Sequence, residues 1–148
     1  MSLRSRNLPR RSCLAIPGSS EKMMGKGPGT NADMVFLDLE DAVAPKEKEA
    51  SRARIVSAIR GHDWGNKVLC VRINDWSTKW TAYDILEVVG NAGERLDEIM
   101  LPKVENAAQV VAADLLLRQV EIASGLPVGH IGIEAQIETA RGLINVEE

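Results

Sequence analysis

The residues best suited to chemistry in this sequence are Asp38, Glu40 and Asp41, which end an apolar run that begins at Met34. A near-continuous apolar run of this kind is typical of a buried parallel strand. In parallel α/β folds, ligands bind at the carboxyl ends of the strands, where these three acids would lie. Carboxylates held away from water are unstable unless a cation compensates them. The run therefore predicts a site that binds a positively charged group.

Two later segments carry ionisable residues in the same way. The strand predicted at 68–73 contains Arg72, and the strand predicted at 130–137 contains Glu134 and leads into Glu138. Because successive side chains of a strand point to opposite faces, each of these strands would turn its aliphatic residues to one face. Their ionisable residues would then meet on the other face, together with the first group of acids.

The predicted site holds more acids than bases. It would contain Asp38, Glu40, Glu134 and Glu138, with only Arg72 and, at most, Lys103 to balance them. Several acids cannot all stay ionised in a confined site without more positive charge, so a bound divalent cation is the simplest solution. Carboxylate oxygens suit Mg²⁺ or Mn²⁺, and there is no cluster of His or Cys that would suit Zn²⁺. An alternative stays open, in which some acids, Asp38 and Glu134 above all, only pair with Arg72 or cap loops.

Alternating strands and helices have to position these residues. Strands are predicted at 12–17, 34–39, 68–73, 98–101 and 130–137, and helices at 19–26, 45–59, 81–89, about 107–123 and from 139 onward. This alternation favours βαβ units and a parallel sheet, either open or curved into part of a barrel. A complete (β/α)8 TIM barrel needs about 250 residues, so we expect an α/β fold with about the first five β/α units of such a barrel. In the second helix, Ala53, Val56 and Ile59 would face the sheet, with Arg52 in water.

Length and composition describe an ordinary globular protein. The chain has 148 residues, 45% of them hydrophobic, so we expect one domain over 11–148 after a flexible tail at 1–10. The net charge of −3 gives no electrostatic footprint for nucleic acid. No apolar stretch approaches the ~20 residues that a membrane helix needs. Cys13 and Cys70 lie in apolar runs without metal-binding spacing, which predicts reduced core residues of a cytoplasmic protein.

A glycine-rich segment at 25–29 contains Lys26 and superficially resembles a phosphate-binding loop. It lacks the spacing of a Walker motif and a Ser or Thr after the lysine. A plain loop is therefore favoured, although Lys26 could still contact a phosphate of a ligand.

Five short segments then form a recognisable series: Arg11-Ser12-Cys13-Leu14 with Pro17-Gly18, Leu37 to Pro45, Val71-Arg72-Ile73-Asn74, Leu101-Pro102-Lys103-Val104 and Ile137-Glu138-Thr139-Ala140. Together they resemble the HpcH/HpaI aldolase and citrate lyase β-subunit family, which includes malyl-CoA lyases, over about residues 10–145. The resemblance implies a (β/α)8 barrel that uses Mg²⁺ to make or break a carbon–carbon bond. A typical substrate is a 3-hydroxyacyl-CoA such as malyl-CoA or citramalyl-CoA, and the reaction passes through an enolate.

The resemblance also assigns roles by position. Glu138 matches the family's first metal carboxylate, and Arg72 matches the arginine that holds the oxo-acid and neutralises oxyanion charge. Glu40 and Asp41 match the acidic pair that organises metal-bound water and this arginine. Arg11 matches a residue near the substrate or the CoA entrance. These roles suit retro-aldol chemistry, because a divalent cation and a fixed guanidinium both stabilise the negative charge that develops.

The sequence departs from the family's pattern after Glu138. The second metal carboxylate of the family is an Asp about 25–30 residues further on, roughly one β/α unit. Only ten residues follow Glu138 here, so we expect the C-terminal half of the barrel to be absent. Two alternatives therefore stay open: a CoA-independent aldolase that releases pyruvate from 4-hydroxy-2-oxo acids, and a catalytically inactive truncated subunit or interaction module. Related enzymes lead us to expect a homo-oligomer, a trimer or hexamer.

Overall fold

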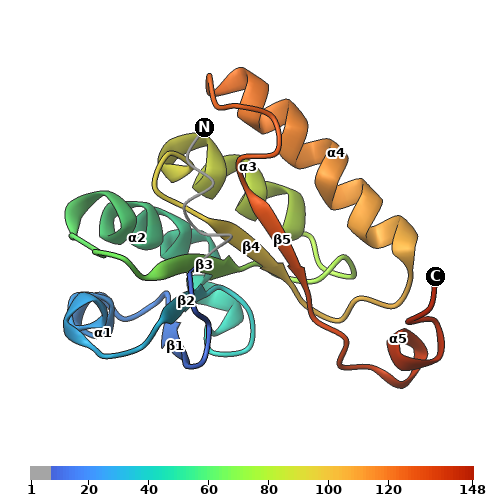
Figure 1. Cartoon of the computed structure of the whole chain (residues 1–148), viewed down its shortest axis with the longest axis horizontal. Helices are drawn as coiled ribbons and strands as arrows, with labels where there is room; N and C mark the ends of the chain where they lie inside the picture. The colour runs from blue at the N-terminus through green and yellow to red at the C-terminus, as the bar shows by residue number, and fades with distance from the viewer. Residues whose placement is uncertain (1–7) are drawn as a thin grey trace.

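The computed structural model describes residues 8–148, which form a parallel sheet covered by helices (Figure 1). The strands are β1 (Cys13–Pro17), β2 (Met34–Asp38), β3 (Val68–Arg72), β4 (Glu98–Leu101) and β5 (Gly132–Ala135). They lie in the order β1-β2-β3-β4-β5, and each neighbouring pair is parallel. The five predicted strands are thus confirmed, each within a few residues of its expected bounds.

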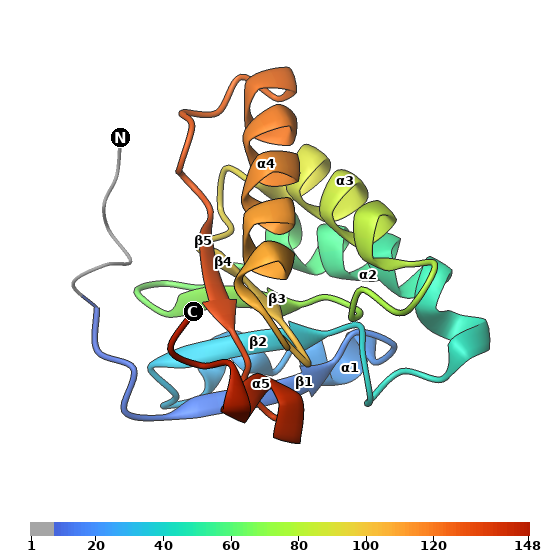
Figure 2. The ribbon, with the colours of Figure 1, turned by 90° about the vertical axis from the view of Figure 1, so that its right-hand side faces the viewer.

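Helical segments connect the strands. They are α1 (Glu21–Met24), η2 (Gly27–Gly29), η3 (Pro45–Glu47), α2 (Lys48–Gly61), α3 (Thr81–Ala92), α4 (Ala107–Ala123) and α5 (Ala140–Ile144). The helices α1 to α4 all lie on one side of the curving sheet (Figure 2). Sequential strand order with helices on a single face is typical of a (β/α)8 barrel, whereas a doubly wound fold reverses its order and covers both faces. This confirms the prediction of the first five β/α units and removes the open-sheet alternative. Within residues 8–148, no helix is both long and apolar enough to cross a membrane.

The two faces of the sheet carry different side chains, as the alternating pattern predicts. Toward the helices, Val35, Leu37, Leu69, Val71 and Ile99 are fully buried in one apolar core with residues of α2, α3 and α4. On the opposite face, Met34, Val68, Cys70 and Met100 form a smaller cluster, against which Phe36 packs. Branched aliphatic residues on successive strands thus fix the register of the sheet.

The inner face of α2 differs from the prediction. Ile55 and Ile59 are buried as apolar residues should be, but Ala53 is exposed and Arg52 is 4% exposed. In this orientation Arg52 donates to the buried carboxylate of Asp84, 2.7 Å away. The inner face of α2 thus includes a buried ion pair, which the hydrophobic pattern alone does not reveal.

The predicted flexible tail covers residues 1–7, which lie outside the described residues, and residues 8–10, which make contacts with the sheet. Leu8 packs against the apolar cluster on the open face, and Arg10 pairs with Glu98 at 2.7 Å. The prediction of two core cysteines holds for Cys70, which is buried, and fails for Cys13, which is exposed at the start of β1. Both thiols are free.

Glu98 leads to a first testable prediction. Burial raises the pKa of this carboxyl to about 7, with Arg10 opposing the rise and Glu134 adding to it. A raised native pKa means that stability is greatest below the unfolded value of 4.5 and declines as the pH rises toward 7. We expect the free energy of unfolding of the wild type to fall by on the order of 1–2 kcal/mol over this range, and Glu98→Gln to remove that fall. Urea unfolding at pH 5 and pH 8 measures it, and an equal decline in both proteins would contradict the prediction.

Candidate active site at the carboxyl ends of the strands

Arg72 is the last residue of β3 and lies in register with Asp38, the last residue of β2. Its Nε donates to Asp38 Oδ1 at 2.9 Å, and its Nη2 donates to Asp38 Oδ2 at 2.7 Å. The guanidinium carbon also lies 5.3 Å from the centre of the Phe36 ring. A bidentate pair of this kind fixes the plane of the guanidinium, and it leaves Nη1 pointing to the remaining side. The sheet register itself therefore orients Arg72.

Asp38 also shapes the loop that follows β2. The side chain is 1% exposed and accepts hydrogen bonds from the backbone N–H groups of Glu40 at 2.8 Å and Ala42 at 3.1 Å. Burial acts to raise the pKa of Asp38, but the bonds from Arg72 and these two amides outweigh it, so the pKa lies below its usual value. Asp38 stays ionised, pairs with Arg72 and caps the loop. This is the role of the alternative in which some acids pair with Arg72 or cap loops instead of binding a metal.

Glu40 lies between two cations. One carboxylate oxygen, Oε1, accepts from Lys103 Nζ, and the other, Oε2, is 3.5 Å from Arg72 Nη1. The residue is 3% exposed, and Oε2 has no hydrogen-bond partner within the described residues. A buried carboxylate oxygen without a donor is destabilising, so this position favours a ligand that brings a proton donor or a cation.

Lys103 joins the ends of four strands. Its Nζ lies 3.7 Å from Asp41 Oδ1 and 3.9 Å from Asp75 Oδ2, in addition to its bond with Glu40. Its backbone N–H donates to Glu138 Oε1 at 3.0 Å. The backbone φ of Lys103 is 52°, a left-handed conformation that is unusual for a residue with a side chain and is concentrated at functional sites. The sequence suggested Lys103 only as a secondary balancing charge, whereas the structure makes it the centre of the site.

Four of the six predicted site residues are thus brought together. Glu40, Asp41 and Glu138 are all contacted by Lys103, and Arg72 contacts Glu40. Glu138 is exposed in the turn before α5, which Thr139 begins by accepting from the N–H of Gly142.

The other two predicted residues lie elsewhere. Arg11 precedes β1 and pairs with Asp33, which precedes β2, so it lies at the amino ends of the strands. Lys26 follows α1, in a segment that passes close to His62 and Trp64 beyond the end of α2. Each side chain is carried to the edge of the sheet opposite the site, and the expected contacts of Arg11 and Lys26 with substrate gain no support from the geometry.

Glu134 does not join the site either. On β5 it is in register with Met100, four residues before Glu138. Its charge helps to raise the pKa values of Glu98, Cys13 and Cys70. The predicted convergence of Glu134 with the other acids is wrong, because its strand position faces it toward the middle of the open face.

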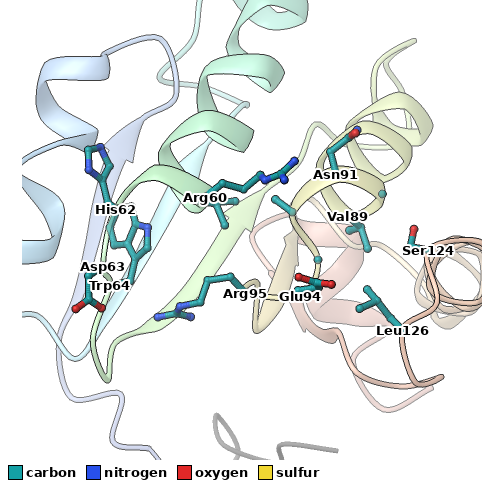
Figure 3. A pocket seen from close by; sticks show the side chains of 14 residues that line it. Arg60, His62, Asp63, Trp64, Val89, Asn91, Glu94, Arg95, Ser124 and Leu126 are labelled. Atoms are coloured by element: carbon teal, nitrogen blue, oxygen red, sulfur yellow. The ribbon is translucent and has the colours of Figure 1, made fainter.

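A pocket of about 490 Å³ lies away from this site (Figure 3). It is lined by the ends of α2 and α3 and by the segment after α4, with Arg60, His62, Trp64, Asn91 and Ser124 among its residues. It opens at the amino-terminal edge of the sheet and contains none of the predicted site residues. The pocket and the predicted site are therefore separate features of the chain.

The site has the chemistry of a divalent-cation site but an incomplete ligand set. Its carboxylates are those of Asp38, Glu40, Asp41, Asp75 and Glu138, and its cations are those of Arg72 and Lys103. Carboxylate oxygens are the donors that Mg²⁺ prefers. Among residues 8–148, however, no three His, Cys, Asp or Glu side chains lie close enough together to hold a metal ion. A metal at this position would therefore also take ligands from water, from substrate or from other residues.

Sequence reasoning missed a group of buried polar residues beneath the site. Lys48, Asn74 and Asp84 are all at most 7% exposed, and hydrogen bonds connect them to one another or to the backbone of Glu40. Asn74 lies directly after the strand that carries Arg72, and this position was the one available signal. Lys48 and Asp84 occupy helical positions that usually face water, so their pattern gave none.

Three comparisons place these observations among known proteins. The family described as "HpcH/HpaI aldolase/citrate lyase" matches residues 11–148. An L-malyl-CoA/beta-methylmalyl-CoA lyase of Cereibacter sphaeroides (strain ATCC 17029) is 44% identical over 95% of this chain and 44% of the relative. A citrate lyase subunit beta of Leuconostoc mesenteroides subsp. cremoris is 37% identical over 94% of this chain and 45% of the relative.

A solved structure shares the fold. The protein CitE of Mycobacterium tuberculosis, in complex with magnesium and acetoacetate, superimposes with a TM-score of 0.70 and 31% identity. The match covers all of this chain and 51% of that one. The chain thus spans about half the length of the proteins it resembles.

Replacing Asp38 tests the organising ion pair. Asp38→Asn leaves the Arg72 guanidinium without its buried countercharge, so we expect a loss of about 3 kcal/mol in the free energy of unfolding at pH 7. The native pKa of Asp38 is lowered, so its contribution is complete above the unfolded value of 3.8 and is lost as the pH falls through the lower native pKa. Urea unfolding from pH 7 down to pH 2 should show the two proteins converging in acid.

Asp33→Asn is the matched control for this prediction. Asp33 makes the same two-pronged pair with Arg11, but that arginine is exposed. Water and salt screen such a pair, so its loss should be much smaller. Equal losses in the two variants would refute a special role for the Asp38–Arg72 pair.

Proposed function

Because this chain belongs to the HpcH/HpaI aldolase/citrate lyase family, we propose that it supplies the first half of the active site of a Mg²⁺-dependent carbon–carbon lyase. The proposed substrate is a 3-hydroxyacyl-CoA of the malyl-CoA type, as the name of the relative at 44% identity suggests. The observation that carries the proposal is the orientation of Arg72, which faces a group of carboxylates at the edge where barrel enzymes bind their substrates.

Arg72 is proposed to hold the oxo-acid product, or the corresponding end of the substrate. Asp38 fixes two of its nitrogens, so Nη1, which lies 3.5 Å from Glu40 Oε2, is the nitrogen proposed to meet the oxo-acid. A guanidinium held in this way stabilises oxyanion charge where it develops and loses little entropy in doing so. The nearby carboxylate of Glu40 attracts the guanidinium of Arg72 and holds it toward the carboxylates of the site.

Glu138 is proposed to hold the metal together with ligands that the described residues do not include. Its second oxygen, Oε2, is left for a cation, since Oε1 accepts from the N–H of Lys103. When bound, Mg²⁺ supplies a Lewis acid that polarises a carbonyl oxygen. Support comes from the carboxylate chemistry of the site and from the magnesium in the CitE complex, a protein 31% identical to this chain.

Glu40 and Asp41 are proposed to organise bound water and the cations around the reacting groups. Glu40 is buried, and it contacts both Arg72 and Lys103, whereas Asp41 is exposed at the entrance. The hydrogen bond to Glu40 raises the pKa of Lys103 and keeps it charged. The ammonium thus holds the acids together when no other cation is present.

Arg72→Lys and Glu138→Gln test this function in the purified protein. Arg72→Lys keeps the charge but cannot make the fork with Asp38, so kcat/KM for malyl-CoA should fall 100-fold or more. Glu138→Gln keeps an oxygen that accepts from the N–H of Lys103, but it replaces the proposed carboxylate ligand by a neutral amide. The Mg²⁺ concentration for half-maximal activity should therefore rise at least tenfold. Formation of glyoxylate and acetyl-CoA is followed directly.

Arg118→Lys is the control, because Arg118 is exposed on α4 and, within residues 8–148, its ion pair is with Asp114. It should keep wild-type turnover. Near-wild-type activity of both Arg72→Lys and Glu138→Gln would exclude the proposed mechanism.

The same assays separate the alternatives. Turnover of free 4-hydroxy-2-oxo acids with release of pyruvate, and none of acyl-CoA, would instead indicate the CoA-independent aldolase. Failure of every substrate, together with no Mg²⁺ binding in isothermal titration, would indicate an inactive subunit or interaction module. The homo-oligomer and the cytoplasmic location remain predictions from the family and from the two free thiols.

A further inference from the structure

A buried polar network lies directly beneath Glu40, and the mechanism above does not use it. Its first member, Lys48, is the first residue of α2 and is 7% exposed. Lys48 Nζ donates to three acceptors: the carbonyl oxygens of Leu39 and Glu40, each at 2.8 Å, and Asn74 Oδ1 at 2.7 Å. An ammonium has three protons, so this lysine is fully satisfied without any surface carboxylate.

The network continues away from the site. Asn74 donates its backbone N–H and its Nδ2 to the same oxygen of Asp84, at 2.9 and 2.7 Å. The other oxygen of Asp84 accepts from Arg52 at 2.7 Å. Arg52 lies one helical turn after Lys48 on α2. Asp84 is completely buried, so these bonds hold α2, α3 and the end of β3 in one arrangement.

The charges of this network explain why a lysine can lie there. Burial lowers the pKa of Lys48, and Glu40, Asp38 and Asp84 act against this effect. The ring of Trp80 lies 5.3 Å from Nζ and adds a further attraction for the cation. Lys48 therefore contributes positive charge behind the acids of the site, from the buried side.

We propose that Lys48 is a positioning residue, which holds the backbone of Leu39 and Glu40 against Asn74 so that the Glu40 carboxylate meets Arg72 and Lys103. Asn74, Asp84 and Arg52 support it by fixing the orientation of the amide that Lys48 contacts. The catalytic part of this inference rests on the proposed lyase function. The part that concerns the order of the loop does not, because it depends only on the bonds to the two carbonyl groups.

Lys48→Met and Lys67→Met form a matched pair of variants. Lys67 is half-buried and, like Lys48, donates to two carbonyl groups, those of Thr30 and Ala32, but at the amino-terminal edge of the sheet. Both changes remove an ammonium that joins loops, so both should lower the melting temperature. Only Lys48→Met should speed amide hydrogen exchange at residues 39–42, by at least tenfold.

The kinetic comparison uses the complete protein, with rates divided by the folded fraction. In Lys48→Met we expect kcat and kcat/KM to fall together by at least tenfold, because the interaction that is lost acts in the transition state. In Lys67→Met both should stay within twofold of wild type. A purely structural role would leave kcat per folded molecule unchanged, and that result would overturn the proposal. Equal losses in the two variants would overturn it as well.

Asn74→Ala tests the proposal if Lys48→Met does not fold. It removes one of the three acceptors of Lys48 and leaves the two carbonyl bonds, so it should lower kcat about fivefold. An unchanged kcat would overturn the proposal. If wild-type protein lacks lyase activity, the proposed function fails, and the exchange rates at residues 39–42 then decide the role of Lys48 alone. Unchanged exchange in Lys48→Met would overturn that role.

Discussion

The carboxyl edge of this sheet depends on one ion pair, the two-pronged contact of Arg72 with Asp38. The pair forms because β2 and β3 are parallel and end in register, so the two side chains leave the sheet side by side. Asp38 then anchors the next turn of the chain through two backbone amides, which brings Glu40 back toward Arg72. A contact between two strands thus determines both the shape of the loop and the direction of the guanidinium.

A second feature of this edge is the arrangement of its charged side chains, from buried cations to exposed carboxylates. The buried cations Lys48 and Arg52 lie behind the acids, Arg72 and Lys103 lie among them, and Asp41 and Glu138 are exposed at the front. The positive charges are thus buried or fixed by ion pairs, while two of the carboxylates are exposed to solvent.

The sequence predicted the strands, their parallel order and the inward face of β2, because these follow from aliphatic residues at a spacing of two. It also predicted Arg72 and Glu40 as neighbours, since both end strands. It failed for Arg52 and Lys48, because charged residues on a helix are usually in water and their burial depends on partners far along the chain. The roles of Arg11 and Lys26 stay predictions, because a short motif does not say at which edge of the sheet it lies, and both residues lie away from Arg72.

The left-handed backbone of Lys103 has a bearing on how such a protein evolves. Glycine adopts this conformation without strain, so a change of Lys103 to glycine would relieve about 1 kcal/mol of local backbone energy. The same change would delete the ammonium that gathers Glu40, Asp41 and Asp75. It would also leave the buried Glu40 carboxylate without its ammonium donor, which costs more than the relieved strain. Selection for stability alone would therefore retain Lys103 despite its unfavourable backbone.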